Sequence, residues 1–470
     1  MSVDTNNAEF QDALNLIQYT RQSVFLTGKA GTGKSTFLRY VCEHTKKKHV
    51  VLAPTGIAAI NAGGSTMHSF FKLPFYPLLP DDPNLSLQRG RIHEFFKYPK
   101  PHRKLLEQIE LVIIDEISMV RADIIDAIDR ILRVYSHNLR EPFGGKQLLL
   151  VGDVFQLEPV VKNDEREILN RFYPTPYFFS ARVFGQIDLV SIELQKVYRQ
   201  TDPVFVSVLD HIRTNTAGAA DLQLLNTRYG SQIEESEADM YITLATRRDT
   251  VDSINEKKLA ELPGEPITFE GVIEGDFPES SLPTSQDLVL KPGAQIIFIK
   301  NDFDRRWVNG TIGVIAGIDE EEETIYVITD DGKECDVKLE SWRNIRYHYN
   351  EKTKEIEEEV LGSFTQYPIR LAWAITVHKS QGLTFSRVVI DFTGGVFAGG
   401  QAYVALSRCT SLDGIQLKKP VNRADVFVRP EIVNFAGRFN NRQAIDKALK
   451  QAQADVQYLS LIHISEPTRL

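Results

Sequence analysis

The sequence predicts an α/β fold built on parallel sheets, with a small antiparallel β-barrel inserted into its second half. Short runs of apolar, β-branched residues alternate with helical stretches along most of the chain, a pattern typical of parallel strands joined by crossover helices. A glycine-rich turn follows the first such run and opens a helix. Between about residues 265 and 365, short alternating runs are separated by Asn-Gly and Asp-Gly turns, which indicate β-hairpins.

Length and composition indicate a globular protein of several domains. The 470 residues are 42% hydrophobic and 25% charged, and a chain of this length allows roughly three or four domains. The three cysteines (Cys42, Cys335 and Cys409) lie far apart, which argues against a disulfide framework or a zinc site. No apolar run reaches the roughly 20 residues that cross a bilayer, and the polar, acidic N-terminus is neither a secretory signal nor a transit peptide. We therefore expect a soluble, intracellular protein.

The charge balance argues mildly against nucleic acid as a partner. The formal net charge is −9 and the isoelectric point is near 5.7, whereas a protein that held DNA by a general basic surface would be cationic. Binding to nucleic acid would need a local groove that uses hydrogen bonds and base stacking on an otherwise acidic body.

Residues 1–22 are expected to form a helix whose apolar face includes Phe10 and Ile17. Gln11 lies on this helix, shortly before the glycine-rich turn. Its amide offers the paired donor and acceptor that recognition of adenine requires. A solvated glutamine on a helix surface explains the residue equally well.

The stretch Thr27–Thr36 reads TGKAGTGKST and matches the pattern G-x-x-x-x-G-K-[ST] between an apolar strand and an amphipathic helix. Backbone N–H groups of such a turn surround phosphates, and the helix N-terminus points at the anion. Lys34 would reach the β- and γ-phosphates, and the Ser35 hydroxyl would bind Mg²⁺. The sequence therefore predicts a nucleoside triphosphate site. Its expected contacts are Gly28, Ala30, Gly31, Thr32, Gly33, Lys34, Ser35 and Thr36.

A second buried strand, 49–53, ends in a loop of small and polar residues. Loops at the carboxyl ends of parallel strands are where such sheets bind ligands. Neutral donors and an aromatic pair in this loop suit contacts to a single-stranded backbone and stacking on bases, although Phe70 and Phe71 fit a hydrophobic core equally well. The candidate residues are Thr55, Asn61, Ser65, His68 and Phe70.

Residues 73–104 are rich in proline and aromatic residues, and we expect an irregular excursion or small subdomain here. The basic residues near its end could touch phosphate, but a solvated face is the commoner explanation for them. These residues are Lys97, Lys100, Arg103 and Lys104.

Two further buried strands end in carboxylates. The run LVIIDE ends at Asp115, which can hold Mg²⁺, and at Glu116, which can orient and deprotonate the attacking water. The run LLLVGD ends at Asp153, and Gln156 follows where it could sense the γ-phosphate. Because a phosphate loop precedes them by less than about 80 residues, the paired carboxylates favour a catalytic role.

Four more candidate site residues lie after residue 195. Arg199 lies at the start of an amphipathic helix and is either a phosphate sensor or an ordinary surface arginine. A second α/β unit begins near Tyr241 and resumes after the hairpin region, where His378 and Lys379 follow an apolar run. Arg408 lies in a helix of small residues, and a buried guanidinium there needs an anionic partner such as a γ-phosphate.

Taken together, these stretches resemble the PIF (petite integration frequency) group of superfamily-one helicases, which are related to the RecD-like helicases. The resemblance covers nearly all of residues 8–430, and YSHNLREPFGGKQLLLVGD is similar to the signature of the PIF group. NDFDRRWVNGTIG is similar to the inserted Src-homology-type barrel of these proteins. The other motifs occur in the family's order: GKAGTGKST, APTGIAAINAGGSTMHSFF, IIDEISMV, VGDVFQLEPV, LQKVYRQTDPVF, VHKSQGLTF and YVALSRC.

The resemblance implies two RecA-like lobes of the phosphate-loop class, with ATP bound between them. It assigns Lys34, Gln156, Arg199 and Arg408 to catalysis beside Glu116, with both arginines stabilising charge, and it adds Gly382 to the ATP site. Thr55, His68 and His378 would lie along the path of single-stranded DNA, with Lys379 beside them. The expected domains are lobe one (1–195, with the 73–104 excursion as a wedge), lobe two (196–264 and 366–430), the inserted small barrel with flanking strands (265–365) and a C-terminal helix (431–458).

The activity implied by the resemblance is that of an ATP- and Mg²⁺-dependent helicase that moves 5′ to 3′ on single-stranded DNA and unwinds duplexes. G-quadruplexes and RNA–DNA hybrids are further implied substrates, with roles in DNA replication, repair, recombination and telomere maintenance, and the active form is expected to be a monomer that does not bind membranes. One alternative is a nucleic-acid-stimulated ATPase that translocates or remodels complexes without unwinding. A small-molecule phosphotransferase would leave the motifs of the second lobe unexplained.

The last twelve residues, 459–470, resemble translated vector or adaptor sequence, and we expect them to contribute nothing to activity. The lack of a targeting sequence favours a bacterial or phage origin and a cytoplasmic, nucleoid-associated protein. A eukaryotic relative would instead work in the nucleus or the mitochondrion.

Overall fold

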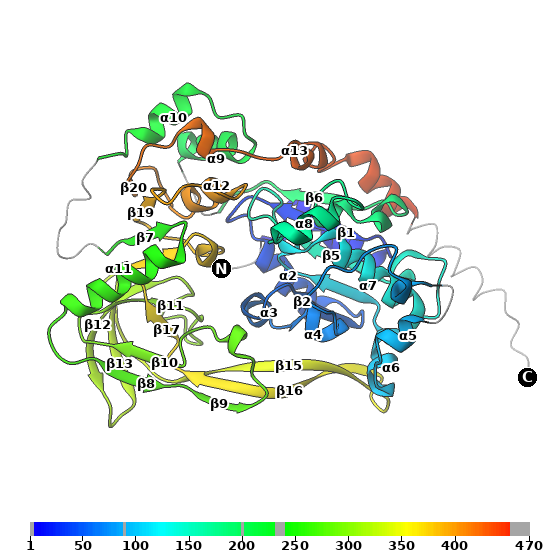
Figure 1. Ribbon diagram of the computed structural model, residues 1–470, viewed down its shortest axis with the longest axis horizontal. Coiled ribbons are helices and arrows are strands. Elements are labelled where there is room, and N and C mark those ends of the chain that lie inside the picture. Colours follow the sequence, from blue (N-terminus) through cyan, green and yellow to red (C-terminus); the bar gives the residue numbers. More distant parts are fainter. Residues whose placement is uncertain (1–3, 88–90, 199–201, 231–239, 452–470) are drawn as a thin grey trace, which may run out of the picture.

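The computed structural model describes residues 4–87, 91–198, 202–230 and 240–451. Two parallel sheets lie beside each other, and a group of antiparallel strands extends from the second sheet and runs beneath the first (Figure 1). The predicted α/β class with two parallel-sheet lobes is confirmed. No helix among the described residues is long and apolar enough to cross a membrane.

Lobe one contains a six-stranded parallel sheet with the strand order β3-β2-β4-β5-β1-β6. The four apolar runs of the sequence are β1, β2, β4 and β5, as predicted, and β3 and β6 complete the sheet. The strands are β1 (Val24–Gly28), β2 (His49–Ala53), β3 (Ser65–Thr66), β4 (Leu111–Ile114), β5 (Gln147–Val151) and β6 (Val190–Leu194). The helices are α1 (Ala8–Tyr19), α2 (Lys34–His44), α3 (Gly56–Ala62), α4 (Met67–Phe71), α5 (Arg91–Phe95), α6 (Lys100–Gln108), α7 (Ala122–Tyr135) and α8 (Asn163–Leu169).

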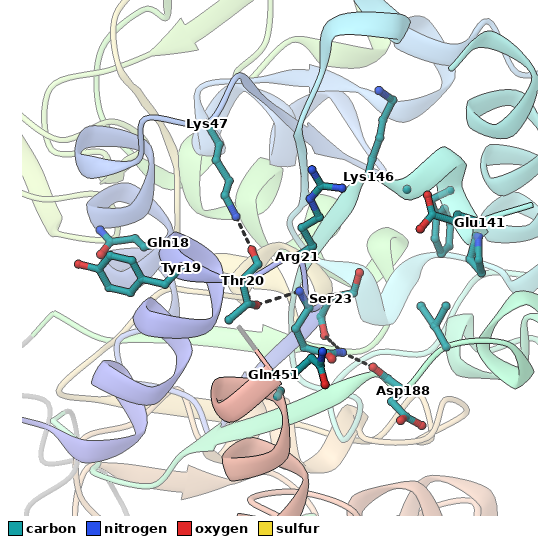
Figure 2. Close-up of a pocket in the computed structure, with 16 residues that line it drawn as sticks. Gln18, Tyr19, Thr20, Arg21, Ser23, Lys47, Glu141, Lys146, Asp188 and Gln451 are labelled. Atoms are coloured by element: carbon teal, nitrogen blue, oxygen red, sulfur yellow. Dashed lines mark hydrogen bonds between the residues drawn. The ribbon is translucent and has the colours of Figure 1, made fainter. Parts of the chain in front are cut away.

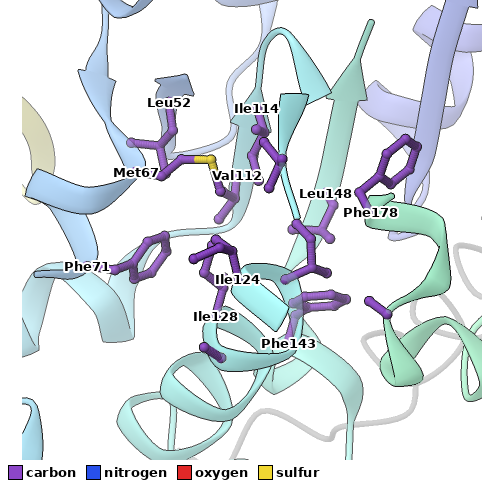
Figure 3. Packing of buried hydrophobic residues seen from close by; sticks show 14 of the residues in the cluster. Leu52, Met67, Phe71, Val112, Ile114, Ile124, Ile128, Phe143, Leu148 and Phe178 are labelled. Carbon is purple, nitrogen blue, oxygen red and sulfur yellow. The ribbon is translucent and has the colours of Figure 1, made fainter. Parts of the chain in front are cut away.

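Helices cover both faces of this sheet, which is why its strands are apolar along their whole length. Leu26 and Val51 face a core that also holds residues of α1 and α2. Val112 and Leu148 face the opposite core, where Ile128 of α7 packs against them (Figure 3). Both cores exclude water from the sheet, so the loops at its carboxyl edge rest on a rigid base.

Lobe two contains a four-stranded parallel sheet with the strand order β18-β7-β19-β20. Its strands are β7 (Ile242–Ala245), β18 (Ala374–Thr376), β19 (Val388–Asp391) and β20 (Ile415–Leu417). Its helices are α9 (Pro203–Arg213), α10 (Ala219–Asn226), α11 (Arg248–Glu261) and α12 (Gln401–Leu406). Because β7 pairs directly with β18, the long insertion leaves and re-enters the lobe between adjacent strands.

The insertion forms three antiparallel sheets, where the sequence predicted a small barrel with flanking strands in 265–365. A five-stranded sheet of order β14-β13-β12-β11-β17 encloses the apolar core, and its last strand lies beyond residue 365. The other two sheets are β10-β8 and β15-β16-β9. The strands are β8 (Ile267–Glu270), β9 (Val272–Gly275), β10 (Asp287–Leu290), β11 (Gln295–Phe298), β12 (Ile312–Asp319), β13 (Thr324–Thr329), β14 (Glu334–Val337), β15 (Glu340–Asn350), β16 (Glu355–Gln366) and β17 (Ile369–Leu371).

The β15–β16 hairpin reaches from the insertion to lobe one (Figure 1). It contacts α6, and Tyr347 of β15 is buried in the lobe-one core. The Val51 N–H donates to the Tyr347 hydroxyl at 3.3 Å, and the Phe70 ring lies 6.2 Å from the Tyr347 ring. The hairpin therefore links the insertion to lobe one by a route separate from the lobe-two sheet.

The expected excursion at 73–104 is folded against lobe one. It contains α5 and the start of α6, and its apolar side chains, including Leu78 and Ile92, belong to the lobe-one core. Lys97, Lys100 and Arg103 are exposed, and Lys104 pairs with Glu107 at 3.1 Å. These contacts favour the solvated-face interpretation of the basic residues.

The C-terminal region differs from the single helix predicted for 431–458. Helix α13 (Pro430–Ala436) ends before a turn in which Asn440 has a left-handed φ of 54°, and residues 442–451 form a second helical segment. Phe435 and Ile445 pack into the two opposite cores of lobe one. Residues 452–458 and the tail at 459–470 lie outside the described residues.

Candidate nucleotide-binding site and nucleic-acid interface

The glycine-rich turn joins β1 to α2 at the carboxyl edge of the lobe-one sheet. Gly33 immediately precedes α2 with a φ of 93°, and no side chain caps the helix. Gly28 cannot be replaced without a clash, because a Cβ there would lie 2.4 Å from Thr32 Oγ1 and 2.8 Å from the Leu194 carbonyl oxygen. The turn therefore presents backbone N–H groups of the first helical turn to an anion.

Lys34 folds back into this turn. Its Nζ donates to the carbonyl oxygens of Gly28 and Lys29 at 2.8 Å and 3.1 Å. These contacts hold the ammonium group inside the loop, where a phosphate can take their place.

Asp115 and Glu116 follow β4 at the same edge. The Glu116 N–H donates to Asp115 Oδ1 at 2.9 Å, and Glu116 itself has a left-handed φ of 51°. The pKa of Glu116 is raised to about 7, first by burial and then by the nearby Asp115 carboxylate, while Lys34 and Arg408 oppose the shift. Burial also raises the pKa of Asp115. A carboxyl group with a pKa near neutrality suits a general base.

A cavity of about 590 Å³ adjoins these groups and is lined by both lobes. Lobe two contributes Gly382 and Arg408, and the insertion contributes Val308. The predicted residues that line the cavity from lobe one are Ala30, Gly31, Thr32, Gly33, Lys34, Ser35, Thr36, Asp115, Glu116 and Gln156. The structure therefore brings together residues that are almost 380 positions apart (30 to 408) in one nucleotide-sized space.

Two predicted ATP contacts are placed differently. Gln11 does not line the cavity, and its Nε2 donates to the Thr5 carbonyl oxygen at 2.6 Å, so its amide is used within the N-terminal segment. Gly28 does not line the cavity, and its carbonyl oxygen accepts a hydrogen bond from Lys34 Nζ. Asn7, Phe10 and Tyr40 line the cavity instead, and no motif in the sequence singled them out.

The Arg408 side chain forms part of the cavity wall and is almost fully buried. Its Nε donates to the Val404 carbonyl oxygen at 2.9 Å, and one terminal nitrogen donates to the carbonyl oxygens of Ser380 and Leu383 at 3.2 Å and 3.3 Å. These bonds fix the guanidinium near Glu116, as the predicted role requires. Arg199 lies outside the described residues, although Tyr198 before it lines the cavity.

The carboxyl edge of lobe one also holds the predicted polar loop. Thr55 is exposed and caps α3 by accepting from the Ala58 N–H at 3.2 Å, and Asn61 is exposed on the same helix. His68 is half-buried, and burial and then Arg121 lower its pKa. The Phe75 ring stacks on the His68 ring with centroids 5.0 Å apart and planes at 7°.

Two predicted DNA contacts in this loop are wrong. Phe70 is only 4% exposed and packs against Phe71 within the lobe-one core, so its ring is not available to a base. Ser65 is buried in the short strand β3. Phe75, which is 85% exposed, is the aromatic side chain that the loop presents, and it lies in the proline-rich stretch where the sequence carries no periodic signal.

In lobe two, His378 and Lys379 follow β18 in a single 3₁₀ turn. Burial lowers the pKa of His378. Burial also lowers the pKa of Lys379, and the positive charges of Arg370 and Arg248 add to the effect. The carboxyl edge of this sheet is therefore locally cationic on an acidic protein.

A second cavity, of about 840 Å³, lies at the opposite edge of the lobe-one sheet, before β1 and β5 begin (Figure 2). Two of its lysines bind helix ends. Lys47 Nζ donates to the carbonyl oxygens of Ile17 and Thr20, both at 2.6 Å, and Lys146 Nζ donates to those of Glu107 and Ile109 at 3.0 Å and 2.7 Å. Burial lowers the pKa of each lysine to about 8. Their contacts explain both lysines as caps of helix C-termini.

The sequence of residues 5–214 matches the family described as PIF1-like helicase. The ATP-dependent DNA helicase Pif1 of Campylobacter jejuni is 33% identical over 412 residues, which cover 84% of this chain and 88% of that protein. The chain belongs to the PIF1-like helicase family. The human ATP-dependent DNA helicase PIF1 is also 33% identical, and the match covers 84% of this chain and 58% of the human protein.

Solved structures of PIF1-like helicases share the whole fold. Bacteroides sp. Pif1 in complex with ADP-AlF4 has a TM-score of 0.84 at 41% identity, over 92% of this chain and 96% of that one. Bacteroides Pif1 bound to single-stranded DNA has a TM-score of 0.63 at 42% identity over the same share of both chains. The predicted enzyme class, an ATP hydrolase of the DNA helicase type, is confirmed by these relatives.

Proposed function

We propose that this PIF1-like helicase hydrolyses ATP between its lobes, moves 5′ to 3′ along single-stranded DNA and unwinds duplex DNA. The observation that carries the proposal is the composition of the nucleotide cavity. Lobe one supplies the phosphate loop and the carboxylates, and lobe two supplies Gly382 and Arg408. ATP bound to both walls of the cavity stabilises the closed arrangement of the lobes, and ATP hydrolysis allows the lobes to open.

Within the cavity, each residue has a distinct task. The loop N–H groups and Lys34 bind the phosphates, and Glu116 accepts the proton of the attacking water. Gln156 orients that water near the γ-phosphate, and Arg408 offsets the charge that develops there. Ser35 and Asp115 are oxygen donors of the kind Mg²⁺ prefers, and the bound ion would offset phosphate charge.

DNA would lie across the carboxyl edges of both sheets. Thr55 and Asn61 offer neutral donors on lobe one, His68 with Phe75 offers a stacking surface, and His378 with Lys379 offers donors on lobe two. A relative supports the binding of single-stranded DNA, since Bacteroides Pif1 has been solved bound to it. Alternating grip by the two lobes then moves the strand, by about one nucleotide per ATP if the chain follows its family.

Separation of the strands is assigned to the 73–104 segment and the insertion. Both lie beside lobe one, where α6 contacts the β15–β16 hairpin. G-quadruplexes and RNA–DNA hybrids would be opened by the same ATP-driven movement of the two lobes. A single copy completes the ATP cavity, so a monomer is the proposed active unit; in one related study, two coordinating Pif1 helicases unwind forked DNA.

The test of this function is ATP hydrolysis with and without a single-stranded oligonucleotide. We expect stimulation of kcat by at least about tenfold, because DNA that binds both lobes favours the closed cavity. Lys34→Ala is the control that removes the phosphate contact. Hydrolysis at the same rate with and without DNA would contradict the proposal and favour a nucleotide-processing enzyme without a nucleic-acid track.

A further inference from the structure

Arg213 of α9 connects the two lobes through two charged contacts, of which the one to Asp153 is closed to solvent and the one to Glu193 is partly exposed. Its side chain is 4% exposed. One terminal nitrogen donates to Asp153 Oδ1 at 3.1 Å, and the other donates to Glu193 Oε1 at 2.8 Å. The guanidinium also lies 4.4 Å from the centre of the Phe155 ring.

These partners belong to a different lobe from Arg213 itself. The apolar face of α9, including Phe205 and Ile212, packs in the lobe-two core. Asp153 follows β5, and Glu193 lies within β6, so both carboxylates move with lobe one. The contacts therefore cross the boundary that opens and closes during an ATPase cycle.

Asp153 is joined to the nucleotide cavity as well as to Arg213. Its side chain is fully buried, and its Oδ2 accepts from Gln156 Nε2 at 3.4 Å. Gln156 lines the cavity, and its Oε1 accepts from Gln381 Nε2 of lobe two at 3.4 Å. Gln381 follows directly after the turn that holds His378 and Lys379. A continuous set of hydrogen bonds thus runs from α9 through Asp153 and Gln156 to the DNA-facing turn.

Stability alone does not account for this arrangement. Burying three charges carries a large desolvation penalty, and well-packed apolar side chains commonly stabilise such a site as well or better. A buried ion pair does fix the relative position of the groups that form it, because a displaced charge would be left without a partner.

We propose that Arg213 is a positioning residue that holds Gln156, through Asp153, in the orientation required for ATP hydrolysis when the lobes close. The proposal rests on the proposed role of Gln156 at the γ-phosphate. Arg213 does not touch ATP. It transmits the position of lobe two to Gln156, the side chain that is proposed to contact ATP.

The chain offers a matched set of variants for the test. Arg213→Lys keeps the charge but loses the two-pronged contact, and Asp153→Asn keeps the size of the carboxylate but loses its charge. Glu193→Gln is the control, because it weakens the other arm of Arg213 and leaves the contact to Asp153. Melting temperature, ADP affinity, and kcat and KM for ATP with and without single-stranded DNA would be measured for each full-length variant.

We expect Arg213→Lys and Asp153→Asn each to lower kcat by about tenfold while KM and ADP affinity change by less than about twofold. Glu193→Gln should keep at least about half of the wild-type kcat. The double variant Arg213→Lys/Asp153→Asn should lose no more than the worse single variant, since both act through one contact.

Two results would overturn the inference. One is a kcat for Arg213→Lys within about twofold of wild type. The other is an equal loss in Glu193→Gln accompanied by a similar fall in melting temperature, which would leave Arg213 as a structural link. If Arg213→Lys does not fold, Asp153→Asn against Glu193→Gln decides the question. If wild-type protein shows no DNA stimulation, the proposed function fails, and the ratios of basal kcat still decide the role of Arg213.

Discussion

Glu116 and Asp115 are neighbours in the chain, and burial raises the pKa of both. Glu116 also adopts a left-handed backbone conformation, which an L-residue rarely takes. Burial raises the pKa of Glu116 to about 7. The pair therefore separates the two tasks of the site, with Asp115 suited to a metal and Glu116 to a proton.

Glu116→Gln tests this division directly. We expect ATP hydrolysis to fall by at least about a thousandfold, because an amide cannot accept the proton, while ATP binding stays within about threefold of wild type. Steady-state hydrolysis and fluorescent-nucleotide titration provide the measurements. Lys34→Ala is the contrasting variant, since it should lose binding and turnover together. Hydrolysis by Glu116→Gln at near the wild-type rate would show that another group is the base.

Phe70 and Phe75 lie five residues apart and have opposite environments. Phe70→Ala should lower the free energy of unfolding by about 3–5 kcal/mol, because it empties part of the lobe-one core. Phe75→Ala should change it by less than about 0.5 kcal/mol and weaken single-stranded DNA binding by about 1–3 kcal/mol through lost stacking. Chemical denaturation and fluorescence anisotropy measure the two effects, and Phe75→Trp should restore binding. Unchanged DNA affinity in Phe75→Ala would remove Phe75 from the DNA path.

At the scale of secondary-structure elements, helix α6 holds a half-buried histidine against aromatic side chains of lobe one. His102 of α6 lies against Tyr98 and Phe70, with ring centroids 4.9 Å and 5.3 Å away. Burial lowers the pKa of His102 to about 4, and the charges of Lys72 and Arg346 act in the same direction. In the unfolded chain the same imidazole has a pKa near 6.5.

Acid should therefore weaken the fold in a defined window. Between pH 6.5 and 4 the unfolded state binds a proton at His102 that the folded state does not, so the free energy of unfolding falls as the pH is lowered, by at most about 3 kcal/mol from this residue. His102→Phe, which keeps an aromatic ring, should flatten the dependence in this window. Urea denaturation at several pH values measures it. Equal slopes for wild type and His102→Phe would contradict the assignment.

Strands β1, β2, β4 and β5 were predictable because each is a continuous apolar run, whereas β3 and β6 were not predicted. The sequence also indicated that the second lobe is interrupted by antiparallel strands. Alternation along a strand such as β15 shows which side chains share a face, but it does not show what that face contacts. The docking of Tyr347 on lobe one, and the division of the insertion into three sheets, therefore required the structure.

The nucleotide site was predictable to the extent that its residues belong to motifs. Lys34, Glu116, Gln156 and Arg408 meet in one cavity as expected. Arg213 carries no such signal, because an arginine at the end of an amphipathic helix is most often exposed. Its partners Asp153 and Glu193 become visible only when the two lobes are placed together.

At the scale of the whole molecule, the acidic composition is compatible with DNA binding. The net charge of −9 belongs to the entire protein, whereas Lys379 of lobe two lies near the positive charges of Arg370 and Arg248, which Asp252 partly balances. A local cationic edge with neutral donors opposite is the kind of groove that an acidic protein needs in order to hold a single strand.

The lobes and the insertion are joined at several points: the nucleotide cavity, the Arg213 contacts and the β15–β16 hairpin. Movement at the nucleotide cavity would therefore act on the Arg213 contacts and on the β15–β16 hairpin. A cycle of ATP binding and hydrolysis would shift the insertion relative to lobe one. This arrangement is suited to turning hydrolysis into directed movement along a strand, which is the central claim of the proposed function.

ATP-driven unwinding of a short duplex that carries either a 5′ or a 3′ single-stranded tail tests that claim most directly. We predict strand separation from the 5′ tail, none above background from the 3′ tail, and none with Glu116→Gln on either substrate. Unwinding from the 3′ tail alone would reverse the proposed direction. No unwinding from the 5′ tail, with hydrolysis still stimulated by single strands, would contradict the helicase activity and leave a translocating or remodelling ATPase.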